Sequence, residues 1–135
     1  MTDVLFFLTL SEVEDMHADQ ITEFGGSMGV RDLGGLKSAI AQPEATFGGE
    51  FLHEGVFEMA AAYAFHIAEN QPFLDGNKRT ALNAAVNFLA LNGFEVVDAE
   101  GLLYSAMIGL SDGTWNKSTL ALLLKRLSNP WDDDA

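Results

Sequence analysis

Apolar residues recur at helical spacing near the start of the chain. Thr9, followed three residues later by Glu12, forms a capping box, which marks the beginning of a helix. Beyond it, apolar side chains lie near the helical period of about 3.6 residues, at Leu10, Val13, Met16, Ile21 and Phe24. Because Gly25-Gly26 provides a helix-ending turn, the pattern predicts a helix over residues 9–24.

Two later segments are apolar on nearly every side. They cover residues 56–69 and 77–91, and alanine is the most frequent residue in both. A helix without a polar face is normally buried in a globular protein, and small side chains let neighbouring helices approach closely. The pattern therefore predicts two central buried helices, the second ending at Asn92-Gly93.

Shorter apolar runs predict the remaining elements. These are a brief strand over residues 4–8, a helix over 31–42, a strand over 94–97, a helix from Asp98 or Glu100 to about Leu110, and a last helix that begins at Thr114 or Ser118 and includes 120–127. Pro43 ends the second helix, and the acidic tail, residues 130–135, is expected to fray. The expected fold class is all-α: a compact bundle around the two buried helices, with room for one or two very short strands.

The loop over residues 44–53 leaves two alternatives open. It carries Phe47 and Phe51 among glycines and acidic residues. The two phenylalanines either pack into the core or form an exposed edge on which a substrate docks.

Composition and charge narrow the class of protein. The chain has 135 residues, enough for one domain over 1–135, and no apolar run approaches the ~20 residues of a membrane span. The start lacks the basic region of a signal peptide, and the absence of cysteine suits a reducing cytoplasm. The net charge of −13 disfavours direct binding of nucleic acid and suits a basic protein partner.

The segment between the two buried helices carries the candidate chemistry. Gly76 and Asn77 suit the beginning of a helix, and Lys78-Arg79 follows in its first turn. Cations there oppose the helix dipole unless an anion joins them, so the arrangement favours a phosphate site. The other adjacent pair, Lys125-Arg126, lies in the last turn of a helix, where cations are favourable. An ordinary helix start with two surface cations is the alternative.

Residues 71–79 read Gln-Pro-Phe-Leu-Asp-Gly-Asn-Lys-Arg. The stretch resembles the core motif of the Fic/Doc (fido) family, His-Pro-Phe-x-Asp-Gly-Asn, followed by Gly-Arg in adenylyl-transferring members and by Lys-Arg in death-on-curing (Doc-type) toxins of type II toxin–antitoxin systems. Gln71 alone departs from the Doc-type form, at the position of the catalytic histidine. The resemblance covers nearly the whole chain, and includes residues 7–10, Gly25-Gly26, Arg31-Asp32, residues 43–49 and Asn92-Gly93.

The resemblance implies a role for each motif position. Asp75 would hold Mg²⁺, which prefers oxygen ligands. Asn77, together with the backbone N–H groups of Gly76 to Lys78, would cradle a phosphate of ATP or another nucleoside triphosphate. Lys78 and Arg79 would clamp the phosphate oxygens, the arginine in a bidentate fork.

The reaction type is also implied by the resemblance. The longer Lys78, in place of glycine, favours transfer of the γ-phosphate over adenylylation, which stays as the alternative. The acceptor would be a hydroxyl of a translation factor, elongation factor Tu, and the outcome would be growth arrest. Pro72 would stiffen the loop, and a buried Phe73 would anchor it.

Gln71 changes the expected activity. An amide does not accept a proton near neutral pH, and loss of a general base costs about 10²–10⁴-fold in rate. The chain is then either a toxin impaired by an engineered or natural substitution, or a pseudoenzyme that binds an antitoxin. The family partner is a small basic antitoxin whose C-terminal helix docks in a groove.

Three other residues are weaker candidates for a role in the site. His17 is expected to be a partly buried histidine with a satisfied hydrogen bond, and His66 a core histidine outside the motif's register. Glu69 is the nearest carboxylate that could replace the missing base. The resemblance places the protein in the bacterial cytoplasm.

Overall fold

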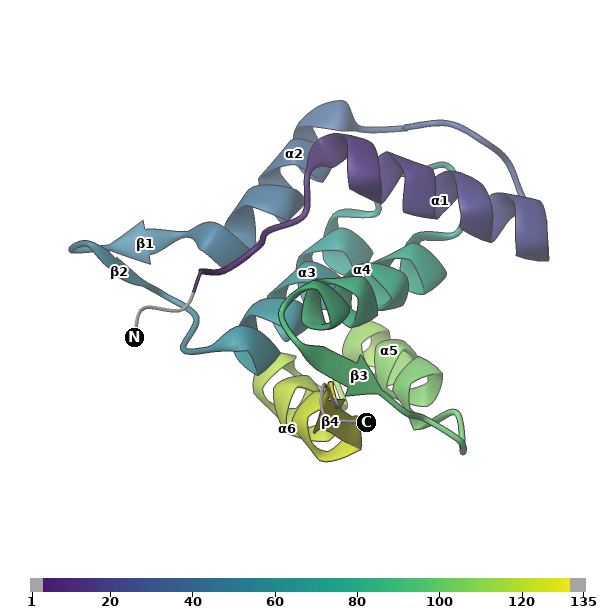
Figure 1. Ribbon diagram of the computed structural model, residues 1–135. Helices are drawn as coiled ribbons and strands as arrows, with labels where there is room; N and C mark the ends of the chain where they lie inside the picture. The colour runs from purple at the N-terminus through teal and green to yellow at the C-terminus, as the bar shows by residue number, and fades with distance from the viewer. Residues whose placement is uncertain (1–3, 132–135) are drawn as a thin grey trace.

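The computed structural model describes residues 4–131 (Figure 1). Over these residues the helices are α1 (Leu10–Phe24), α2 (Leu33–Ala41), α3 (Val56–Asn70), α4 (Asn77–Leu91), α5 (Leu102–Asp112) and α6 (Lys117–Leu127), with a 3₁₀ turn η1 (Gln42–Glu44) after α2. The short strands form two antiparallel pairs. β1 (Thr46–Phe47) pairs with β2 (Glu50–Phe51), and β3 (Phe94–Val96) pairs with β4 (Ser128–Pro130). The mostly α-helical fold class is confirmed.

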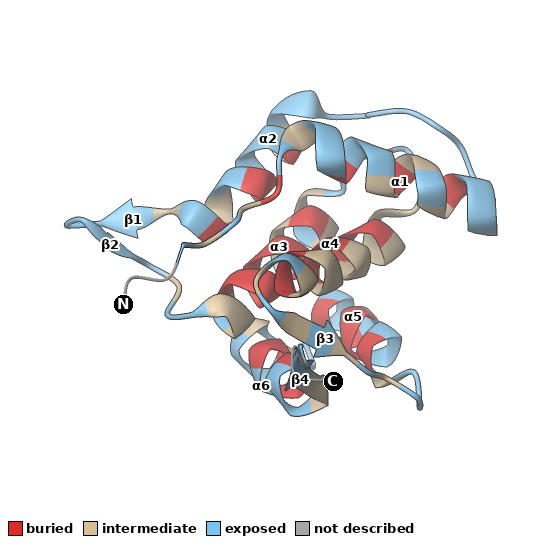
Figure 2. Cartoon of the chain, in the orientation of Figure 1, coloured by how far each residue is buried: buried red, intermediate tan, exposed pale blue. Residues whose placement is uncertain are grey.

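Helices α3 and α4 form the centre of the molecule. Fully buried alanines lie on both helices, at Ala60, Ala61, Ala62 and Ala64 of α3 and Ala81, Ala84 and Ala85 of α4. Figure 1 shows α1 and α2 on one side of this pair and α5 and α6 on the other, and Figure 2 shows the buried residues concentrated on α3 and α4. The two predicted central helices are therefore confirmed.

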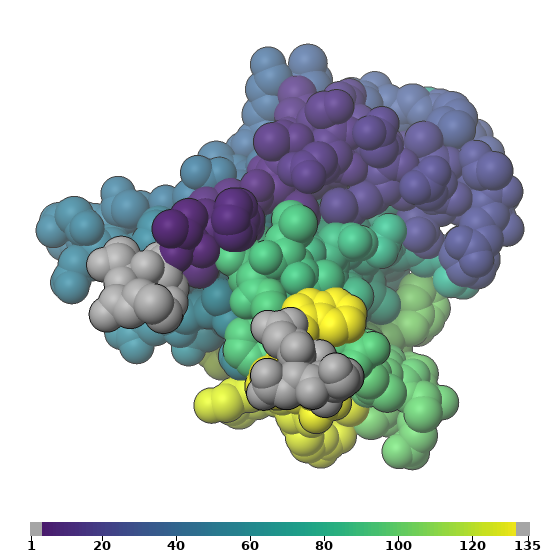
Figure 3. Space-filling view, viewed as in Figure 1, coloured from purple at the N-terminus to yellow at the C-terminus, as the bar shows by residue number. Residues whose placement is uncertain are grey.

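The segment before α1 is extended but forms no strand. Asn92, at the end of α4, accepts a hydrogen bond from Phe6 N (3.0 Å) and donates one to Phe6 O (2.9 Å). Leu8 N donates to the hydroxyl of the buried Tyr63 at 2.9 Å. The predicted strand over residues 4–8 is wrong because side chains, and not a neighbouring strand, satisfy this backbone. Figure 3 shows the segment, in dark purple, lying against the surface of the body.

The chain beyond α6 is ordered further than expected. Pro130 pairs with Phe94 in the β3–β4 ladder, where an edge position tolerates the missing N–H of proline. Trp131 donates from its backbone N to Gly93 O at 2.8 Å and from its indole Nε1 to Ala90 O at 3.1 Å. The prediction of a frayed tail is thus wrong for residues 130 and 131, and residues 132–135 lie outside the described part of the chain.

Two helices begin at positions that the sequence pattern did not predict. The carboxylate of Asp98 accepts hydrogen bonds from Leu102 N and Leu103 N, so α5 begins only at Leu102. Asn116 and Thr119 form a capping box, so α6 begins between the two predicted starts. Neither phenylalanine of the β1–β2 hairpin packs into the core: Phe47 is 81% exposed, and Phe51 is 43% exposed although its ring contacts that of Phe7.

Lys117, the first residue of α6, attaches this helix to the body. Its Nζ lies 3.2 Å from His66 Nε2 and 3.5 Å from His53 Nε2. Burial and the nearby Lys117 charge lower the pKa of His66 to about 4, so its neutral ring accepts a hydrogen bond from the ammonium group. His66 is half-buried, and it has a structural contact with α6.

None of the helices within residues 4–131 has the length and apolar character needed to cross a membrane.

Replacing Asn92 should destabilise the fold. Asn92→Ala removes both hydrogen bonds to Phe6 and the one to Phe88 O, and we expect a loss of about 1–3 kcal/mol in the free energy of unfolding. Urea titration measures the change. Asn87→Ala is the matched control, because its described amide bonds stay within α4, and we expect a smaller loss. Equal losses in the two variants would contradict the proposed anchoring.

Acid should destabilise the protein partly through His66. Its pKa in the folded protein lies below the ordinary value of 6.5, so the unfolded chain binds the proton more readily, and stability falls as the pH drops from 6.5 towards 4. Between about pH 7 and pH 4.5, His66→Gln should lose less stability than the parent, by on the order of 1 kcal/mol after allowance for solvent screening at this half-buried site. Urea titrations at both pH values test this, and equal losses would refute it.

Candidate functional site

The turn between α3 and α4 is built on a left-handed residue. Gln71 directly follows α3 and has a φ of 45°. Within residues 4–131, all other residues with a positive φ are glycines. Pro72 and Phe73 follow and are buried, so the predicted anchoring of the loop by Phe73 is confirmed. The loop returns to the surface at Leu74 and Asp75, and Gly76 precedes α4 with φ at 74°.

Asn77 holds this loop closed from the first position of α4. Its Oδ1 accepts a hydrogen bond from Phe73 N at 2.9 Å, and its Nδ2 donates to Phe73 O at 3.0 Å. Because both ends of the side-chain amide are engaged, the side chain shapes the loop. The part of Asn77 left for a ligand is its backbone N–H group.

Helix α1 supports the loop from one side. His17, which is 4% exposed, stacks on the Phe73 ring with centroids 3.8 Å apart, and its Nε2 donates to Asp75 O at 2.8 Å. This is the satisfied, structural histidine that the sequence indicated. A Cβ on Gly76 would lie 3.1 Å from Ile21 of α1, so α1 approaches the loop where a side chain would not fit easily.

The segment between α1 and α2 holds the loop from the other side. The backbone N–H groups of Arg31 and Asp32 donate to Pro72 O at 2.7 and 3.0 Å. The Arg31 guanidinium donates to the carbonyl oxygens of Asn70 and Gln71, which the end of α3 leaves without helical partners. Sequence reasoning did not assign Arg31 a role in the site.

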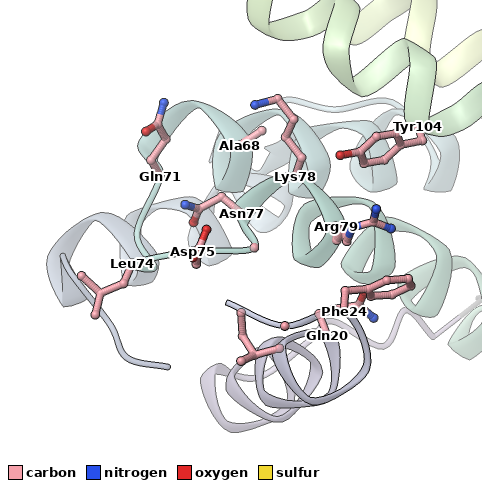
Figure 4. Close-up of a pocket in the computed structure, with 13 residues that line it drawn as sticks. Gln20, Phe24, Ala68, Gln71, Leu74, Asp75, Asn77, Lys78, Arg79 and Tyr104 are labelled. Atoms are coloured by element: carbon pink, nitrogen blue, oxygen red, sulfur yellow. The ribbon is translucent and has the colours of Figure 1, made fainter. Parts of the chain in front are cut away.

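A cavity of about 500 Å³ opens beside the start of α4 (Figure 4). It is lined by Gln20, Ile21, Phe24, Gly25, Ala68, Gln71, Leu74, Asp75, Gly76, Asn77, Lys78, Arg79 and Tyr104. The structure therefore brings together every residue that the sequence singled out for catalysis or phosphate binding. No side chain caps α4 and no acidic residue lies in its first turn, so its N–H groups remain available to an anion.

The two cations of the first turn reach different parts of this cavity. Figure 4 shows Lys78 extending towards the side of Gln71, while the Arg79 guanidinium lies between two aromatic rings. Its Cζ is 4.0 Å from the centroid of Phe24 and 4.8 Å from that of Tyr104. Neither ring was predicted to belong to the site, because both come from helices distant in sequence.

Two carboxylates lie near the loop in different settings. Asp75 is exposed, and its Oδ2 accepts a hydrogen bond from Ser27 N at 3.2 Å, which leaves the other oxygen for a cation. Glu69 lines a smaller cavity of about 180 Å³ together with Gln71 and Ser111. Residues 4–131 contain no cluster of three or more His, Asp or Glu residues placed to bind a metal. Magnesium at Asp75 would thus need phosphate oxygens and water as further ligands, which is its usual coordination.

Known proteins have sequences similar to this one. The family described as Fic/DOC matches residues 7–89, which run from the segment before α1 to near the end of α4. A protein named Toxin Doc from Mycolicibacterium smegmatis is 41% identical over 96 residues, which cover 67% of this chain and 74% of that protein. A protein named Protein kinase doc from Escherichia phage P1 is 34% identical over 116 residues, which cover 86% of this chain and 90% of that protein. With its motif loop inside the matched region and relatives aligned over most of its length, this chain belongs to the Fic/DOC family.

Proposed function

We propose that this protein is a Doc-type toxin whose cavity binds a magnesium–nucleoside triphosphate and whose ancestral reaction is phosphoryl transfer to a hydroxyl of elongation factor Tu. The observation that carries the proposal is the uncapped start of α4, where Lys78 and Arg79 line the 500 Å³ cavity beside Asp75. The names of the two relatives, a toxin and a protein kinase, support it. Growth arrest would follow from the loss of a translation factor.

Different groups of the cavity bind the phosphates and stabilise the negative charge of the transferred group. Backbone N–H groups at the start of α4 bind a phosphate, and the positive end of the helix dipole favours its charge. Lys78 and Arg79 add charge where negative charge develops on the transferred group. Asp75 would hold Mg²⁺, which when bound neutralises phosphate oxygens. As Lys78 takes the place of the glycine of adenylyl-transferring relatives, γ-phosphoryl transfer is the preferred reaction.

Gln71 limits the reaction in this chain. As the acceptor oxygen bonds to the γ-phosphorus and the bond to the leaving nucleoside diphosphate breaks, the hydroxyl proton must pass to a base. The Gln71 amide accepts no proton near neutral pH. Because Arg31 holds the residue 71 carbonyl, a histidine introduced there would have a backbone already fixed in place. This chain is therefore proposed to bind nucleotide with little turnover.

A non-catalytic role is the second candidate, and Gln71 favours it. A groove of about 320 Å³ between α1, α4 and α5 offers the apolar side chains of Phe24, Leu82 and Val86 with Glu23 at its edge. An amphipathic helix could lay its apolar face in such a groove. We propose the C-terminal helix of a small basic antitoxin as its occupant, because the net charge of −13 favours a cationic partner.

Restoring the histidine should restore transfer. With Mg²⁺ and ATP, Gln71→His should modify elongation factor Tu at least about 10²-fold faster than the parent chain, because it regains a general base. Intact-protein mass spectrometry of the factor measures the rate and distinguishes a gained phosphate from a gained adenylate. Gln71→Ala is the control and should stay inactive. If the histidine variant leaves the factor unmodified, the enzymatic proposal fails and the binding role remains.

Removing either first-turn cation should weaken nucleotide binding. Lys78→Ala and Arg79→Ala each lose a charge-assisted contact with phosphate, so we expect Mg-ATP to bind about 10- to 100-fold more weakly than to the parent. Isothermal titration calorimetry measures the dissociation constants. Lys125→Ala removes an exposed cation from the last turn of α6 and should leave the affinity unchanged. A parent chain that binds no Mg-ATP would refute the proposed site.

A further inference from the structure

Arg79 is held by side chains from two other helices. Phe24 is the last residue of α1, and Tyr104 lies in the first turn of α5. Their ring centroids lie 4.0 and 4.8 Å from the Arg79 Cζ, and Figure 4 shows the guanidinium between them. Three helices thus meet at one cation on the wall of the cavity.

The position of the Arg79 guanidinium between two rings leaves its hydrogen-bond donors free for a ligand. The N–H donors of a guanidinium lie in its plane, whereas its faces stack on aromatic rings. A guanidinium whose faces lie against two rings is therefore restrained without using the donors that a phosphate needs. A restrained arginine also loses less conformational freedom when it binds, which improves affinity.

The rings are not explained by core packing. Phe24 is 53% exposed and Tyr104 is 38% exposed, so neither is buried in the hydrophobic core. Both line the 500 Å³ cavity and the 320 Å³ groove, and Arg79 lies at the boundary between the two. Two partly exposed rings beside one cation are more simply explained by contact with that cation.

We infer that Phe24 and Tyr104 are positioning residues, which hold the Arg79 guanidinium between their rings so that its N–H edge is presented to a phosphate in the cavity. The identity of the ligand rests on the proposed function. The restraint on Arg79 does not, because it is a property of the protein without ligand. The two parts therefore call for separate measurements.

The restraint can be measured in the parent chain without nucleotide. In ¹⁵N NMR relaxation, the Nε–H group of Arg79 should be about as rigid as the backbone, and its side-chain protons should be shifted upfield by the rings. Tyr104→Leu and Phe24→Leu should both increase its mobility, while Tyr104→Phe should preserve the rigidity. Phe47→Leu, at the exposed hairpin, is the matched control and should change nothing. An Arg79 Nε–H group as mobile as that of the exposed Arg126 would overturn the inference.

The consequence for binding is tested by a double-mutant cycle with Mg-ATP. Tyr104→Leu should weaken binding about three- to ten-fold, as expected for loss of a cation–π contact, and Tyr104→Phe should restore it. In the Arg79→Ala background the same substitution should have no further effect, because the ring acts through the arginine. An equal loss in both backgrounds would overturn the positioning role.

The two measurements separate the inference from the proposed function. A rigid Arg79 in a chain that binds no Mg-ATP would support the restraint and refute the nucleotide site. A mobile Arg79 in a chain that binds Mg-ATP would refute the restraint and leave the nucleotide site standing.

Discussion

The beginning of α4 is electrostatically unsatisfied, and the rest of the site depends on this. No side chain caps the helix, and Lys78 and Arg79 add two positive charges to the positive end of its dipole. Such an arrangement costs stability in the free protein, and an anion bound there would offset that cost. The surrounding structure accordingly leaves this end open to a cavity, and Asp75 is the acidic residue among those that line it.

Contacts from the surrounding helices hold the loop before α4 in place despite the unfavourable charges at the start of that helix. The alanine-rich faces of α3 and α4 bring the two helices together, and residues 71–76 form the turn between them. His17 and Phe73 fix the loop from α1, and Arg31 fixes it from the segment before α2. Each contact reaches the loop backbone or a buried ring, which leaves the Asp75 carboxylate and the two cations facing the cavity. Loop stability and the proposed ligand binding thus use different atoms of Asp75 and Asn77.

The sequence predicted the parts of the fold that depend on local pattern. The bounds of α4 and the capping box at Thr9 and Glu12 match, because period and caps are read within one segment. It did not predict the contact of Arg31 with Gln71, 40 residues away, or the pairing of Pro130 with Phe94. Such contacts depend on how the helices pack, and nothing in either local segment encodes the partner.

The candidate site shows the same division. Residues 71–79 were recognised from their motif, and the structure places Gln71 and residues 74–79 around one cavity, with Pro72 and Phe73 buried behind it. The motif alone did not reveal that the Asn77 side chain is engaged with Phe73, or that Arg79 is held by Phe24 and Tyr104. The first depends on the turn's backbone geometry, and the second on where α1 and α5 end and begin. The chemistry of the loop is therefore readable from sequence, whereas the arrangement of its side chains is not.

The central claim is that the open end of α4 binds the phosphates of a nucleotide. The most direct measurement is a ¹H–¹⁵N NMR titration of the parent chain with Mg-ATP, followed at the backbone amides. The account predicts that the amides of Gly76, Asn77, Lys78 and Arg79 shift together and saturate, while those of the β1–β2 hairpin stay unchanged. Saturable shifts confined to other parts of the chain, with the start of α4 unaffected, would contradict it.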